Sequence, residues 1–110
     1  MSDPASRKQR GAARLVILDG PRQGTAFPLV MQETLVGRID SAQFVIDDAT
    51  VSRLHARLLL GEDAVTVEDL DSREGTWVNG AAVKGPMRLN DGDQVAFGDV
   101  VVSFHRDDKA

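Results

Sequence analysis

The sequence contains no cysteine, and this absence excludes several classes of function at once. None of its 110 residues supplies a thiol for a disulfide, a nucleophile or a thiolate metal ligand. The chain also lacks any apolar run near the ~20 residues that a membrane-spanning helix requires. Residues 1–14 have no apolar segment of the kind found in a secretory signal. We therefore expect a soluble, cytoplasmic domain.

Positive charge is scarce outside the N-terminal segment. Residues 1–14 carry four basic groups and one acid, a net charge of +3, whereas the remainder carries nine basic and sixteen acidic residues, a net charge of −7. Such an acidic domain is unsuited to general binding of nucleic acid. We expect neither nucleic acid nor a membrane among its partners, and any anion site must be a local cluster of arginines.

Short apolar runs separated by turn residues follow one another along the chain and predict strands, with no amphipathic helix among them. The dipeptide Asn79-Gly80 is a strong signal for a tight type I′ hairpin. We expect a flexible basic tail over 1–14, an all-β, eleven-stranded β-sandwich domain over 15–105, and a C-terminal tail over 106–110. The expected strands are 15–18, 25–29, 34–38, 44–46, 56–60, 64–69, 76–78, 83–84, 87–89, 94–97 and 100–104.

Three places in this acidic domain concentrate groups that suit an anion. A strand ends in Gly37-Arg38, and the loops at 48–55 and 71–76 each contain an arginine and a serine. A guanidinium binds phosphate bidentately, and charge-assisted hydrogen bonds are roughly twice as strong as neutral ones. These segments predict a phosphate site, provided that the fold brings them together.

The order and spacing of four blocks are distinctive. They are Gly37-Arg38, then the Ser-Arg-Leu-His of 52–55, then the Ser-Arg-Glu-Gly-Thr-Trp-Val-Asn-Gly of 72–80, and finally 89–98. Over residues 14 to 105 the sequence resembles the forkhead-associated (FHA) domain family. The resemblance implies a β-sandwich of the SMAD/FHA-like type that binds a phosphothreonine peptide in loops at one end. Such a module links a Ser/Thr kinase pathway to partner proteins.

The resemblance also implies a role for each matched position. Residues for phosphopeptide binding are Arg38 and Ser52, at the phosphate, with Arg53, Arg73 and Glu74 beside them. Residues with a mainly structural role are Gly37, His55, Gly75, Thr76, Asn79 and Gly80, and His55 is expected to join the two loops from behind. The resemblance implies no catalytic residue, no metal and no cofactor.

Glu74 departs from the family pattern, in which asparagine commonly precedes the glycine. A carboxylate cannot donate a hydrogen bond, and it places negative charge beside a phosphate that carries about −1.5 to −2. Glu74 either pairs with Arg73 or Arg53, or selects a basic residue that follows the phosphothreonine. A further interpretation is a phospho-independent protein-interaction module on a divergent FHA fold.

An enzyme is the weakest interpretation. Ser52 and His55 suggest a nucleophile and a base, but they lie three residues apart on one loop with no evident third group. The acidic pairs at 47–48 and 91–93 lack the ligand spacing of a calcium loop and are better explained as turns.

Overall fold

Two β-sheets pack face to face in the structure, a computed structural model that describes residues 12–107. The segments 1–11 and 108–110 of the two expected tails lie outside the described residues, whereas Ala13 and Arg14 belong to the first strand. Within the described range no helix is long and apolar enough to span a membrane. The strands are β1 (Ala13–Ile17), β2 (Ala26–Leu29), β3 (Glu33–Gly37), β4 (Phe44–Val45), β5 (Ala56–Leu60), β6 (Val65–Asp69), β7 (Thr76–Val78), β8 (Ala81–Ala82), β9 (Met87–Leu89), β10 (Gln94–Phe97) and β11 (Val100–Arg106).

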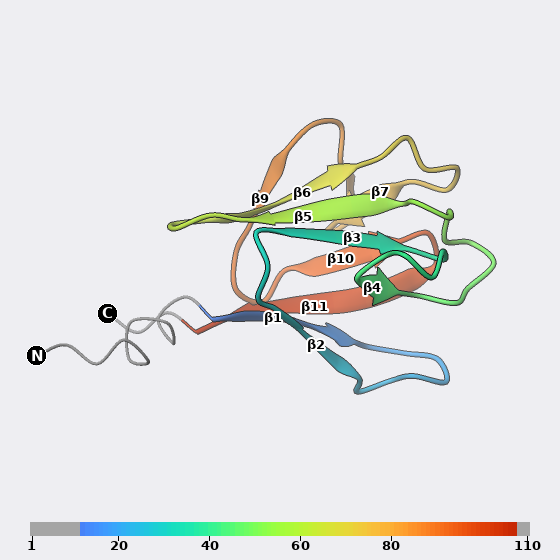
Figure 1. Cartoon of the computed structure of the whole chain (residues 1–110), viewed down its shortest axis with the longest axis horizontal. Helices are drawn as coiled ribbons and strands as arrows, with labels where there is room; N and C mark the ends of the chain where they lie inside the picture. The colour runs from blue at the N-terminus through green and yellow to red at the C-terminus, as the bar shows by residue number, and fades with distance from the viewer. Residues whose placement is uncertain (1–11, 108–110) are drawn as a thin grey trace, which may run out of the picture.

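One sheet has six strands in the order β2-β1-β11-β10-β7-β8, and the other has five in the order β4-β3-β5-β6-β9 (Figure 1). Neighbouring strands run antiparallel except for β3 and β4, which pair in parallel. The prediction of an all-β, eleven-stranded sandwich is confirmed.

Alternating side chains from both sheets fill the space between them. Leu15 and Ile17 of β1 are buried while Val16 is only half-buried, as the two-residue period of a strand requires. Phe97 and Phe104 are fully buried from the six-stranded sheet. An aromatic pair joins one edge strand of each sheet. The ring of Phe27 on β2 stacks on that of Phe44 on β4 at a centroid distance of 4.6 Å.

The hairpin between β7 and β8 corrects one sequence prediction. Asn79 and Gly80 both have positive φ, 50° and 86°, as a type I′ turn requires. This two-residue turn pairs Val78 with Ala81 directly, so β8 is Ala81–Ala82 and not 83–84. Val83 turns back into the core instead, and its N–H donates to the carbonyl of Thr76.

Loops from both sheets meet at one end of the sandwich, on the right in Figure 1. The Arg38 N–H at the end of β3 donates to the carbonyl of Ser52 in the β4–β5 loop at 3.0 Å. The Gly98 N–H in the β10–β11 turn donates to the carbonyl of Gly75 in the β6–β7 loop, also at 3.0 Å. Segments 14 and 23 positions apart in the sequence are thus fixed to one another by backbone hydrogen bonds.

Candidate functional site

The end of β3 is pressed against the β4–β5 loop. A Cβ atom on Gly37 would lie 2.0 Å from the carbonyl oxygen of Arg53, so only glycine allows this approach. The next residue, Arg38, donates from Nε to the carbonyl of Val51 at 2.9 Å. This bond orients the guanidinium and leaves its terminal amino groups free of hydrogen bonds to any described residue.

The β4–β5 loop is built around Asp48. Its Oδ1 accepts the Thr50 hydroxyl at 2.6 Å and the Thr50 N–H at 2.9 Å, and these bonds hold the pKa of the Asp48 carboxyl below its usual value. The Thr50 hydroxyl oxygen also accepts the N–H of Asp99 at 2.9 Å. The loop is therefore fastened both to itself and to the β10–β11 turn.

The β6–β7 loop is built around Asp69. Its carboxylate accepts the hydroxyls of Ser72 at 2.5 Å and Thr76 at 2.6 Å, and the Ser72 hydroxyl oxygen accepts the N–H of Gly75 at 2.9 Å. Burial alone raises the pKa of Asp69, but the hydrogen bonds from Ser72 and Thr76 lower it overall. The carboxylate thus stays ionised at neutral pH and holds the loop in place.

His55 lies fully buried behind the two loops. Its Nδ1 accepts the N–H of Ser52 at 3.0 Å, so the ring proton is on Nε2, which donates to the carbonyl of Gly75 at 2.8 Å. The edge of the ring meets Phe97 of the core at a centroid distance of 5.8 Å. Both ring nitrogens are thus used to join the loops, and neither is free to act as a base for Ser52.

Ser52 also contacts the β6–β7 loop directly. Its hydroxyl oxygen accepts the N–H of Arg73 at 3.0 Å. A hydroxyl can donate while it accepts, and no described residue accepts the Ser52 proton. Ser52 therefore presents one donor at the junction of the loops.

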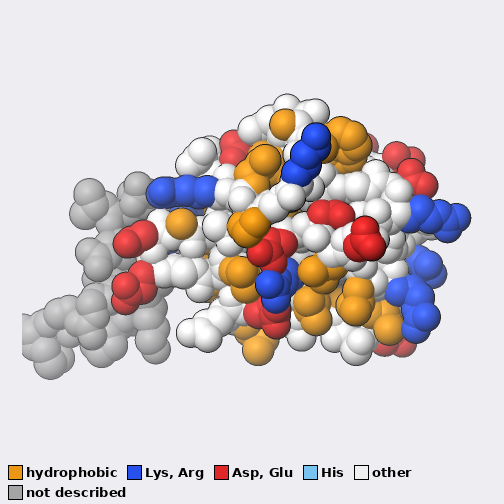
Figure 2. Space-filling view, turned by 90° about the horizontal axis from the view of Figure 1, so that it is seen from above, with side chains coloured by type: hydrophobic (Ala, Val, Ile, Leu, Met, Phe, Trp, Pro, Cys, Tyr) orange, Lys and Arg blue, Asp and Glu red, His pale blue; other side chains and the backbone are white. Residues whose placement is uncertain are grey.

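A cavity of about 340 Å³ opens at this junction, and its wall holds every residue predicted to bind the phosphopeptide. Figure 2 shows Lys and Arg side chains gathered at this end of the molecule. Among residues 12–107, no carboxylate lies within 4.0 Å of the charged nitrogens of Arg38, Arg53 or Arg73. The lining residues are Arg38, Ala49, Thr50, Val51, Ser52, Arg53, Leu54, Arg73 and Glu74, and we call this cavity the arginine pocket.

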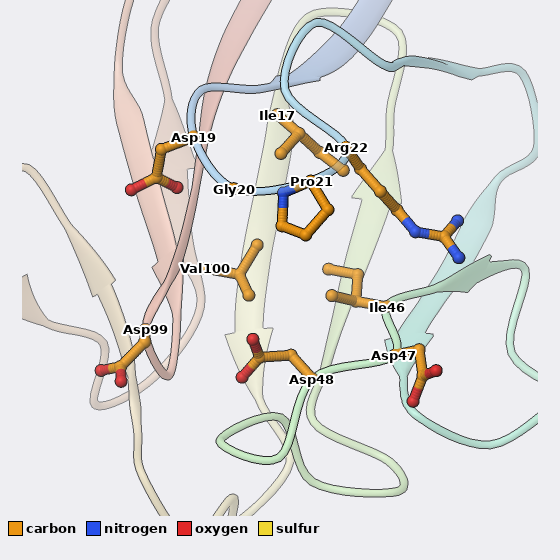
Figure 3. A pocket seen from close by; sticks show the side chains of 10 residues that line it. All are labelled: Ile17, Asp19, Gly20, Pro21, Arg22, Ile46, Asp47, Asp48, Asp99 and Val100. Atoms are coloured by element: carbon orange, nitrogen blue, oxygen red, sulfur yellow. The ribbon is translucent and has the colours of Figure 1, made fainter.

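A second cavity, which is also lined by residues of the β4–β5 loop, has the opposite charge (Figure 3). Asp19, Asp47, Asp48 and Asp99 surround an apolar floor, with Arg22 as its one cationic side chain. Four carboxylates, among them Asp48 with its lowered pKa, would repel a phosphate. Of these two cavities, the arginine pocket is the one that fits an anion.

The remaining predicted residues occupy turns. Gly75 has a φ of 93°, which favours glycine, and it packs against the indole of Trp77. Asn79 and Gly80 lie in the β7–β8 turn, outside the arginine pocket. The Asn79 side chain donates to Asp93 at 3.0 Å and accepts the N–H of Gln94 at 2.9 Å, which fastens this turn to the start of β10.

Sequence reasoning missed Asp48, Thr50 and Asp69 as the supports of the site. The spacing of Asp69 and Ser72 and that of Asp48 and Thr50 both suit local side-chain-to-backbone turns. That pattern was available in the sequence. The bond from Asp99 to Thr50 joins residues 49 positions apart and has no local signal.

Known proteins resemble the chain in both sequence and structure. A sequence profile described as FHA domain matches residues 34–98. The oxoglutarate dehydrogenase inhibitor of Corynebacterium jeikeium is 38% identical over 88 residues, which cover 80% of this chain and 60% of that protein. The glycogen accumulation regulator GarA of Mycobacterium tuberculosis is 39% identical over 88 residues, which cover 80% of this chain and 54% of that protein.

Solved FHA domain structures have the same fold as this chain. One from a structural and functional analysis of phosphothreonine-dependent FHA domain interactions superposes with a TM-score of 0.79 and 31% identity, covering 86% of this chain and 95% of that one. The matched region spans little more than half the length of the two curated relatives. The match of the family profile to more than half of the sequence, together with the eleven-stranded sandwich, shows that the chain belongs to the FHA domain family.

Proposed function

We propose that this domain binds a phosphothreonine-containing segment of a partner protein in the arginine pocket, and so links a Ser/Thr kinase pathway to that partner in the cytoplasm. One observation carries the proposal. Three arginines from three segments converge beside Ser52, and no described carboxylate pairs with them. In a domain with an excess of acidic residues, uncompensated cations held together favour a multiply charged anion.

The donors match the chemistry of a phosphate monoester. It carries about −1.5 to −2 charge at pH 7 and three strong acceptor oxygens. Arg38 offers its terminal amino groups, Ser52 offers its hydroxyl proton, and Arg53 and Arg73 add positive charge. Because hydrogen bonds already fix both loops, little conformational entropy is lost when the ligand binds.

The relatives support a regulatory rather than an enzymatic role. Two are named as an inhibitor and a regulator, and a structure with 31% identity comes from an analysis of phosphothreonine-dependent FHA domain interactions. The occupied nitrogens of His55 also argue against Ser52 as an activated nucleophile. We infer that the domain itself performs no catalysis.

Calorimetric titration with matched phosphothreonine and threonine peptides tests the proposal. The peptides come from a phosphothreonine library selected on the protein. We expect the phosphate to strengthen binding at least ~100-fold, since a charge-assisted contact contributes about 1.5–3 kcal/mol and several are made. Arg38→Ala should remove most of this difference, whereas Arg88→Ala, on the exposed edge strand β9, should leave it unchanged.

The competing function is a phospho-independent interaction module, which is favoured by Glu74. It predicts that partner binding survives both phosphatase treatment and Arg38→Ala. Equal affinities for the two matched peptides, with binding retained in Arg38→Ala, would replace our proposal with this one.

A further inference from the structure

Trp77 contacts the backbone of Glu74, which lines the arginine pocket. Trp77 is the single tryptophan of the chain and is 40% exposed on β7. Its Nε1 donates to the backbone carbonyl of Glu74 at 3.4 Å. An ideal Cβ on Gly75 would lie 3.0 Å from Nε1 and 3.3 Å from Cε2, so the indole rests against the backbone of residues 74–75. An exposed aromatic surface thus adjoins the segment that carries the Glu74 carboxylate.

The Glu74 carboxylate has no partner among residues 12–107. It is exposed and lines the arginine pocket, yet it makes no ion pair within 4.0 Å and its side chain makes no hydrogen bond with a described residue. The pairing with Arg73 or Arg53 considered from the sequence is therefore not formed. Glu74 leaves the arginines available to an anion and keeps its own charge available to a cation.

We propose that Glu74 and Trp77 form a cation subsite that selects a lysine or arginine side chain of the phosphorylated ligand. The inference rests on the proposed function, because it places this side chain on the same ligand as the phosphate. A carboxylate supplies the counter-charge, and the face of tryptophan attracts a cation more strongly than any other side-chain ring. Gly75, which has no side chain, lets the indole pack directly on the backbone next to Glu74.

The distance between the two subsites sets the spacing in the ligand. The Ser52 hydroxyl oxygen accepts the N–H of Arg73 at 3.0 Å. The carbonyl of the next residue, Glu74, accepts the indole N–H of Trp77 at 3.4 Å. The indole therefore lies on the order of 10 Å from the phosphate donor, a span that three residues of extended chain cover. The basic residue is expected two or three positions from the phosphothreonine.

The sign of the Glu74 effect depends on the ligand. Against a peptide with no cation in this position, the carboxylate only repels the phosphate. Against a peptide with a cation there, attraction replaces repulsion. Glu74→Gln retains the size of the side chain and removes its charge. This substitution should weaken binding of peptides with a basic residue in this position and slightly strengthen binding of peptides with a neutral one.

The test compares phosphothreonine peptides with lysine, norleucine or glutamate at each of the three positions on either side of the phosphate. For the wild-type protein we expect lysine to bind about three- to tenfold more tightly than norleucine at one position two or three residues away. Glu74→Gln should abolish this preference and Trp77→Leu should reduce it. Glu62→Gln, in the β5–β6 turn away from the pocket, is the matched control and should retain it.

Intrinsic fluorescence gives a second readout, because every tryptophan signal comes from Trp77. The lysine peptide should change the emission more than its norleucine counterpart. Phosphate-dependent binding with no lysine preference, or a preference that persists in Glu74→Gln, would overturn the cation subsite and leave the phosphate pocket standing. Absence of phosphate dependence for every peptide would overturn both proposals.

Discussion

His55 donates its Nε2 proton to the carbonyl of Gly75, twenty residues further along the chain, at 2.8 Å. The other ring nitrogen accepts the N–H of Ser52 at 3.0 Å. One buried imidazole therefore sets the separation between the loop that carries Ser52 and the loop that carries Arg73. The position of the arginine pocket depends on this contact.

His55→Ala should both destabilise the domain and weaken the site. It leaves a cavity beside Phe97 and removes partners from the Ser52 N–H and the Gly75 carbonyl. We expect the free energy of unfolding in urea to fall by about 2–4 kcal/mol and phosphopeptide affinity to fall at least tenfold. His105→Ala, on a half-buried histidine of β11, should have a smaller effect on stability and none on affinity. Equal effects of the two variants would contradict the role assigned to His55.

Gly37→Ala should displace the β4–β5 loop. The new methyl group would meet the carbonyl oxygen of Arg53 at 2.0 Å, and this neighbour is backbone rather than a flexible side chain. We expect a loss of about 1–3 kcal/mol in the free energy of unfolding and at least a tenfold loss of phosphopeptide affinity. Gly85→Ala is the control, since a Cβ there meets nothing within 4 Å. An unchanged affinity in Gly37→Ala would show that the close approach does not position the site.

The strand pattern was predictable because each sheet has one buried face. Valines at 65 and 67 alternate with half-buried residues and define β6 without knowledge of its neighbours. The prediction failed at β8, where the apolar Val83 suggested a strand. The two-residue turn at Asn79-Gly80 fixes the register instead, and it begins the pairing at Ala81.

The candidate site was predictable only in part. The arginines and Ser52 stand in recognisable blocks, but their convergence depends on contacts between distant segments. The bond between Ser52 and Arg73 spans 21 positions, and that between Thr50 and Asp99 spans 49. Sheet order brings these residues together, and no local pattern in the sequence encodes it. The absence of a described partner for Glu74 likewise became visible only in the folded chain.

Acid should loosen the β6–β7 loop through Asp69. Its folded pKa is lowered, so its contribution to stability is fully present above the unfolded value of 3.8 and is lost as pH falls through the folded pKa. The free energy of unfolding of the wild-type protein should therefore decrease below about pH 4, and Asp69→Asn should be less stable at neutral pH with a flatter acid limb. Urea titrations at a series of pH values from 7 downwards measure the free energy of unfolding of both proteins. If it fell equally with pH in the wild-type protein and in Asp69→Asn, Asp69 would not have this role.

Phosphopeptide affinity should depend on pH through the ligand. The second pKa of a phosphate monoester is about 6, so the dianion that best matches the arginines predominates only above it. Affinity should decrease as pH falls from about 7 to 5. A peptide with a phosphonate of higher second pKa should show the decrease at correspondingly higher pH. If affinity for the phosphate and phosphonate peptides fell over the same pH range, the arginine pocket would not distinguish the monoanion from the dianion.

The location of the bound phosphate is tested most directly by a two-dimensional NMR titration of the ¹⁵N-labelled protein with the selected phosphothreonine peptide. We predict that the largest backbone amide shifts belong to Ser52 and Arg73, whose N–H groups lie at the junction of the two loops, and that the unphosphorylated peptide leaves both unchanged. Shifts centred instead on the acidic cavity around Asp19 and Asp99, or equal shifts with the two peptides, would contradict the account.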